Sequence, residues 1–130
     1  MSQLQIRLAN DVRNFKPSDI VQGTVNWELT HKCDHVEVRL FWTTDGAGAA
    51  ESGLIETVVF EHPQTTEARP FTFRLPAFPY SYQGNLTSVS WVIEAVVFPG
   101  KQNVKETIIM APTARLIVLA NAKHSFGAAA

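Results

Sequence analysis

Cysteine is almost absent from this chain of 130 residues, because Cys33 is the only one. A single thiol cannot form an intramolecular disulfide, which excludes the class of small secreted domains held together by disulfides. The N-terminus has no basic segment followed by an apolar stretch, and the sequence has no predominantly apolar run of the roughly 18 residues that cross a bilayer. We therefore expect a cytoplasmic protein that is neither exported nor membrane-spanning.

Charge is also scarce, at 18% of the residues, and 11 Lys and Arg balance 12 Asp and Glu for a net charge of −1. The basic residues are scattered, so no electrostatic footprint for nucleic acid is present. Hydrophobic residues make up 45% of the chain, which is enough for a packed core. The length suits one domain, expected over residues 1–122, followed by a flexible tail over residues 123–130.

Apolar residues recur at every second position in three segments, which is the period of a strand with one dry face and one wet face. The expected strands and their inward residues are 20–30 with Val21, Gly23, Val25, Trp27 and Leu29; 35–43 with Val36, Val38, Leu40 and Trp42; and 86–98 with Val89, Trp91, Ile93, Ala95 and Val97. Because each sheet must bury its dry face, these strands predict two sheets packed face to face.

Further segments rich in β-branched and aromatic residues are expected to be strands at 3–9, 54–62, 68–75, 104–111 and 114–120. Within 54–62 the phase is ambiguous, because Leu54, Val58 and Phe60 form one apolar set and Ile55 and Val59 form another. No segment has a long helical stripe. The sequence predicts an all-β fold, a two-sheet antiparallel β-sandwich with about eight strands.

Two stretches resemble the arrestin-like β-sandwich family. In residues 15–25 a turn containing Pro17 and the acidic Asp19 leads into a strand interrupted by Gly23. Residues 71–95 run from Phe71 through a Pro, Ser and Gly-rich connection to a strand centred on Trp91, which is similar to the family's extended Phe-Pro strand and the aromatic strand after it.

The resemblance implies an immunoglobulin-like, arrestin-like sandwich that acts as an adaptor or scaffold by binding another protein. Family members usually carry two such sandwiches in tandem, whereas this sequence has room for one, so a cradle between two lobes requires self-association or a partner. No arrestin polar core or receptor-contacting loop maps onto these residues, and regulation of membrane receptors is not implied.

His31, Cys33 and His35 stand at alternate positions and would project to one side of an extended strand, as ligands of zinc or copper could. A fourth ligand is not evident, and a polar turn is the favoured interpretation, with no metal and no cofactor expected. Cys33 lacks the context of a nucleophile, and there is no Gly-x-Ser-x-Gly elbow. Ser81 is expected in a turn. No catalytic residue is assigned, and we expect no enzyme activity.

Apolar residues on nominally wet faces point to a protein-binding surface. Phe41, Val92 and Val96 are out of phase with the inward residues of their strands, and together they could form an exposed patch for a protein partner or a second copy of the chain. On this hypothesis Phe41→Glu or Val92→Glu weakens association without unfolding the domain. The competing interpretations are that loops cover these residues or that they are isolated surface apolars.

Two other binding modes remain open. An exposed sheet edge could accept an added strand, although the sequence does not identify the edge strand. Alternatively, the domain could bind a small ligand or carbohydrate through the aromatic connection that contains Phe78, Tyr80 and Tyr82 and leads to Trp91.

Overall fold

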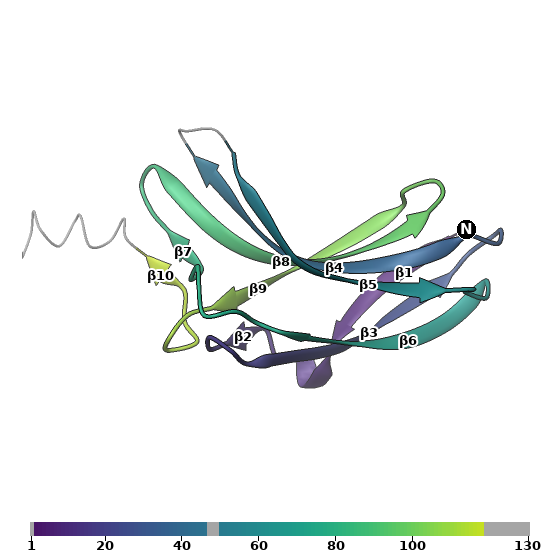
Figure 1. The fold of residues 1–130 in the computed structure, drawn as a ribbon, viewed down its shortest axis with the longest axis horizontal. Coiled ribbons are helices and arrows are strands. Elements are labelled where there is room, and N and C mark those ends of the chain that lie inside the picture. Colours follow the sequence, from purple (N-terminus) through teal and green to yellow (C-terminus); the bar gives the residue numbers. More distant parts are fainter. Residues whose placement is uncertain (1, 47–49, 119–130) are drawn as a thin grey trace, which may run out of the picture.

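The computed structural model describes residues 2–46 and 50–118, and nearly all of its regular structure is β-strand (Figure 1). The predicted tail at 123–130 lies outside the described residues. The elements in chain order are β1 Gln3–Leu8, the 3-10 helix η1 Ala9–Asp11, β2 Asn14–Phe15, β3 Ile20–Glu28, β4 His35–Gly46, β5 Ser52–Glu61, β6 Thr66–Arg74, β7 Tyr82–Gln83, β8 Thr87–Phe98, β9 Asn103–Met110 and β10 Ile117–Val118.

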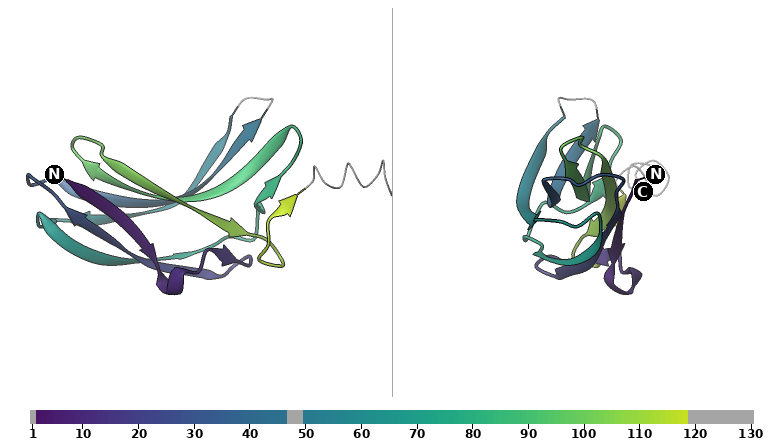
Figure 2. Two further views of the ribbon diagram at one scale, coloured as in Figure 1. Left: turned by 180° about the vertical axis from the view of Figure 1, so that it is seen from behind. Right: turned by 90° about the vertical axis from the view of Figure 1, so that its right-hand side faces the viewer.

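The strands form two stacked sheets, as the sequence predicts. The smaller sheet has three strands in the order β1-β3-β6, and the larger has the order β10-β7-β8-β4-β5, with β9 pairing along β8 and β2 pairing with β9. The long pairings are antiparallel, whereas the short pairs β2–β9 and β7–β10 are parallel. Figures 1 and 2 show the larger sheet curved along its strands, with β8 rising away from the smaller sheet near β7 and β5 ending close to β6.

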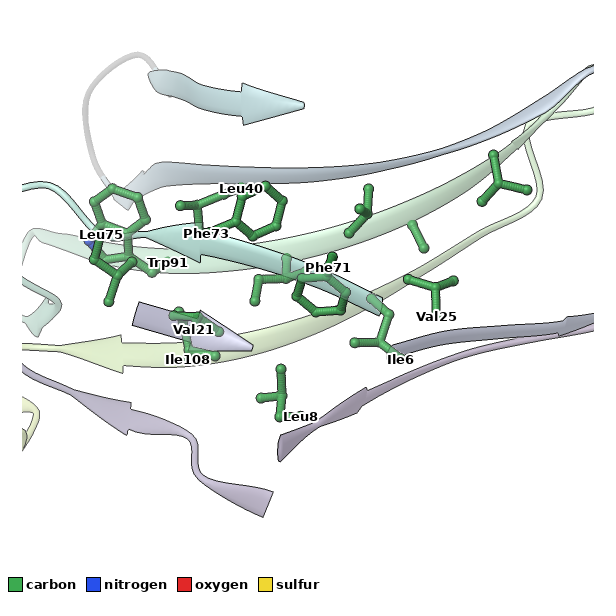
Figure 3. Packing of buried hydrophobic residues seen from close by; sticks show 14 of the residues in the cluster. Ile6, Leu8, Val21, Val25, Leu40, Phe71, Phe73, Leu75, Trp91 and Ile108 are labelled. Atoms are coloured by element: carbon green, nitrogen blue, oxygen red, sulfur yellow. The ribbon is translucent and has the colours of Figure 1, made fainter. Parts of the chain in front are cut away.

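The core lies between the sheets and contains the residues that the alternation predicts. Trp91, Leu40, Val21 and Val25 are 0% exposed, and Phe73 is 1% exposed. Figure 3 shows Trp91 close to Phe73, Leu75 and Leu40, with Val21 and Ile108 on the neighbouring strands. Burying such a side chain contributes roughly 1.5–3 kcal/mol. The predicted inward phases of β3, β4 and β8 are therefore confirmed, with Leu29 and Trp42 partly buried against the same cluster.

β5 resolves its ambiguous phase through a bulge. Phe60 is buried and Val58 packs against the core, so the first apolar set faces inward near the end of the strand. The pairing with β4 then shifts between Leu40 and Phe41, where Leu40 faces Glu56 and Phe41 faces Leu54. The extra residue, Ile55, places Leu54 on the outer face, where it is 62% exposed.

The connection between β6 and β8 differs from its prediction as a simple turn. Ser81 is 2% exposed, its amide donates to the Met110 carbonyl at 2.7 Å, and its Oγ accepts the Met110 amide at 3.0 Å. Such bonds satisfy polar groups that burial removes from water. The connection between β6 and β8 is thus hydrogen-bonded to β9 through Ser81, and this part of it is buried.

Candidate protein-binding surface

The outer face of the larger sheet brings Phe41 and Val92 together, as the sequence hypothesis requires. They are directly opposite in the β4–β8 pairing, and Phe41 is opposite Leu54 in the β4–β5 pairing. Residues opposite in register share a face of the sheet. Leu54, Phe41 and Val92 therefore form a continuous row across three strands, which we call the apolar row, and Ile55 flanks it at 41% exposure.

Val92 and Val96 are buried, so the expectation of an exposed patch made of all three predicted residues is wrong in part. Val92 is 7% exposed and Val96 is 4% exposed, although both point to the outer face. The cause is their place on β8, which has β4 on one side and β9 on the other, so neighbouring side chains cover a small valine from both directions. Val92→Glu would bury a carboxylate and destabilise the domain. It is therefore a poor probe of binding.

Val96 lies apart from the apolar row. Between them runs a polar row in which Arg39 of β4 is opposite Glu94 of β8. Val96 lies in a shallow hollow lined by Arg39, Glu94, Phe98, Lys101 and Asn103. The structure thus places Val96 beneath a charged surface and not within the apolar row.

The charged surface around Arg39 is a connected cluster. Glu37 lies 2.9 Å from Nη2 of Arg39 and 3.0 Å from Nε2 of His35, and Arg39 lies 3.9 Å from Glu94. The Phe98 ring stacks on His35 at 4.8 Å between centroids, and the Arg39 guanidinium lies 5.6 Å from the same ring. These contacts fix the positions of the Arg39 guanidinium, the Glu37 carboxylate and the Phe98 ring, and Arg39 lies in the register row next to the apolar row.

Glu37 makes this cluster sensitive to acid. Partial burial raises the pKa of Glu37, but hydrogen bonds from Arg39 and His35 outweigh it and hold the pKa below its ordinary value. A carboxyl whose pKa is lower in the folded chain stabilises the fold above its unfolded pKa, and this contribution is lost as the pH falls through the folded pKa.

Glu37→Gln should therefore remove part of the acid sensitivity of the domain. Wild type should be more stable than the variant at pH 7 by up to about 1 kcal/mol, the usual size of a surface ion pair, and the difference should shrink as the pH falls below the ordinary range of a carboxyl pKa. Urea unfolding of both proteins between pH 7 and pH 3 measures it. If the difference in free energy of unfolding between the two proteins stays constant from pH 7 to pH 3, Glu37 does not contribute to the acid sensitivity of the domain.

The three residues considered as metal ligands do not face the same way. Cys33 is partly buried against the core, and burial raises the pKa of its thiol. His35 lies on the outer face of β4 and bonds Glu37, while His31 is exposed and bonds Thr30 at 3.1 Å. In the part of the chain that the structure describes, no three His, Cys, Asp or Glu side chains are grouped to hold a metal. The segment between β3 and β4, residues 29–34, has no regular secondary structure.

The aromatic connection also separates into exposed and buried parts. Phe78 is 74% exposed and Tyr80 is 39% exposed, and Tyr82 is half-buried on β7. Trp91 is fully buried, and its indole donates to the Pro79 carbonyl at 2.7 Å. A ligand at this loop would contact Phe78 and Tyr80 but not Trp91.

Comparison with known proteins gives a likeness of fold alone. No family model matches the chain, and no curated protein matches it either. Spo0M, the sporulation control protein of Bacillus subtilis, has an arrestin-like fold and superposes with a TM-score of 0.61 at 16% identity over 85% of this chain. The fold is that of an arrestin-like β-sandwich. The resemblance of residues 15–25 and 71–95 to this family is thus supported at the level of fold.

The chain spans about half the length of Spo0M, since the match covers 49% of that protein. A β-glucosidase from Listeria innocua, in complex with gluconolactone, also matches 85% of this chain and 16% of its own, with a TM-score of 0.45 at 11% identity. That likeness is too weak to carry an argument. No helix among the described residues is long and apolar enough to cross a membrane.

Proposed function

We propose that this domain is a non-enzymatic, cytoplasmic protein-interaction module, an adaptor or scaffold, and that it binds its partner through the outer face of the larger sheet. The observation that carries the proposal is the apolar row, in which Phe41 joins the exposed Leu54 to Val92 across three strands. Contiguous apolar surface with a polar border is typical of protein-binding sites.

The surroundings of the row supply specificity. Phe41 is half-buried, and the exposed part of its ring offers an apolar contact of the kind that aromatic residues make at the centres of interfaces. Arg39 and Glu94 lie in the adjacent register row and are oriented by the cluster described above. Fixed charges of both signs beside an apolar contact select complementary partners and set the orientation of docking.

Phe41→Ser should weaken the binding of a protein partner about thirty-fold or more, because truncating an aromatic anchor costs about 2 kcal/mol or more. Partners retained from cytosol of the source cell by the immobilised wild type are identified, purified and titrated against both proteins. Phe78→Ser is the matched control, since it removes an equally large side chain from the distant connection, where it is 74% exposed. Circular dichroism checks that both variants are folded. Equal affinity of a folded Phe41→Ser for every partner contradicts the proposal.

A small-ligand or carbohydrate site at the aromatic connection is the second candidate, favoured by the exposure of Phe78 and Tyr80. Aromatic faces of this kind stack against apolar faces of ligands. A ligand that binds only the folded state raises the melting temperature. A shift seen with wild type and lost in Phe78→Ser, with no effect of Phe41→Ser, identifies this site as the functional one.

A further inference from the structure

β5 has an open edge that differs from the other edges of the sandwich. Within residues 2–46 and 50–118, β5 pairs with β4 and no strand pairs along its other side. Beyond the bulge, six residues from Glu56 to Glu61 pair regularly with β4. Unpaired backbone groups along such a stretch can pair with another extended chain.

The other edges carry the features that discourage added strands. β6 contains Pro70 and ends at Arg74, β1 is only six residues long, and the end of β9 is covered by β2. Edge strands are commonly protected by proline, by basic residues, by shortness or by cover. β5 has ten residues and contains no Pro, Lys or Arg.

β5 is also apolar on its outer face. Leu54 is 62% exposed and Val59 45%, and Ile55, the extra residue of the bulge, is 41% exposed. An added strand would place every second side chain beside these residues, because side chains alternate between the faces of a strand. Apolar residues at alternate positions of the added strand would cover this surface.

The charges around the edge decide what kind of strand fits. From Leu40 to Ala68 the sequence has no Lys or Arg and five acidic residues, which are Asp45, Glu51, Glu56, Glu61 and Glu67. The Arg69 guanidinium of β6 lies 5.8 Å from the centre of the Phe60 ring of β5 and is paired with Glu67 at 2.8 Å. Glu51, Glu56 and Glu61 lie exposed on or just before β5. A second copy would bring the same acidic edge against itself, and like charges across strands are destabilising.

We infer that the edge of β5 binds an extended segment of a partner protein in which apolar residues alternate with Lys or Arg. The segment adds as a strand beside β5, with its apolar side chains next to Val59 and the apolar row and its basic side chains next to Glu56. The inference rests on the proposed function and names the chemistry of its partner. Backbone pairing supplies affinity, and the acidic edge supplies selectivity for basic segments.

The test uses a synthetic eight-residue peptide of alternating valine and lysine, with a valine and glutamate peptide as its counterpart. Wild type should bind the lysine peptide at least ten-fold more tightly than the glutamate peptide. Glu56→Lys should weaken binding of the lysine peptide at least ten-fold, whereas Glu28→Lys, a charge reversal at an exposed position on β3, should leave its affinity unchanged. Amides of β5 should become protected from hydrogen exchange when the lysine peptide binds.

Three results overturn the inference. Binding of the peptide without protection of β5 amides shows docking on the sheet face. Sedimentation of the free protein as a dimer with β5 protected shows that a second copy occupies the edge. The third result is that the lysine peptide does not bind, while wild type still captures a cytosolic partner that Phe41→Ser does not. This result contradicts binding at the edge of β5 but agrees with the proposed function. If no partner is captured, the proposed function fails as well.

Discussion

Gly23→Ala is expected to lower the free energy of unfolding by about 3 kcal/mol, near the upper end for overpacking a core. Gly23 lies in the central strand of the smaller sheet, opposite Leu8 of β1 and Phe71 of β6. A Cβ added there would lie 2.5 Å from the backbone oxygen of Arg7 and 2.6 Å from the Phe71 ring. Both neighbours must move, and Arg7 can do so only by shifting β1 away from β3.

Urea unfolding of wild type and variant measures the loss, and Gln22→Ala is the matched control because Gln22 is exposed on the opposite face. The control should stay within about 0.5 kcal/mol of wild type. Combining Gly23→Ala with Phe71→Leu should not rescue stability, because the Arg7 carbonyl remains in place. A Gly23→Ala protein as stable as wild type would show that the close approach of β1, β3 and Phe71 is unnecessary.

The larger elements of the fold follow from patterns that the sequence displays directly. In β3, β4 and β8, alternation over nine or more residues leaves one way to bury the apolar set, and the core contains those residues. β10 falls within the strand expected at 114–120, and the two-residue strands β2 and β7 bring the total to ten, above the expected eight. They escape prediction because their pairing depends on contacts with distant segments, such as that of Phe15 with Met110.

The surface was harder to predict because exposure depends on neighbouring strands. Phase predicts that Phe41 and Val92 share a face only if their strands lie in one sheet, and the burial of Val92 follows from the central position of β8, which alternation does not reveal. The bulge that exposes Leu54 is likewise a property of the pairing. A signal for the charged cluster was present, since His35, Glu37 and Arg39 stand at alternate positions on the wet face of one strand.

The apolar row and the open edge both include residues of β5. Variants that alter only one of these two surfaces are therefore needed to tell which of them a partner contacts. Phe41 lies one strand inside the edge, so its truncation tests the face without altering the backbone groups of β5. Glu56 is opposite Leu40, which faces the core, so reversing its charge alters the edge and leaves the apolar row in place. A partner that uses both surfaces would respond to both variants, and one that uses only the face would respond to Phe41→Ser alone.

Trp91→Ala is expected to cost about 3–5 kcal/mol, the usual range for removing a buried large aromatic side chain. Trp91 is 0% exposed and lies among Phe73, Leu75 and Leu40 between the sheets (Figure 3). A loss of this size is a large part of the roughly 5–15 kcal/mol that stabilises a typical domain, so the variant should be largely unfolded at moderate urea concentrations.

Trp91→Phe separates the hydrogen bond from the packing. It keeps an aromatic ring but removes the donor to the Pro79 carbonyl, and an unpaired buried acceptor costs about 1–3 kcal/mol. Its stability should lie between those of wild type and Trp91→Ala, and hydrogen exchange should rise in the connection around Pro79 and Ser81. Unchanged exchange there would show that the Ser81 bonds to Met110 hold the connection without Trp91. Val92 follows Trp91 on β8 and points to the opposite face. If packing of Trp91 in the core fixes the position of β8, and with it the apolar row, Trp91→Phe should also weaken partner binding.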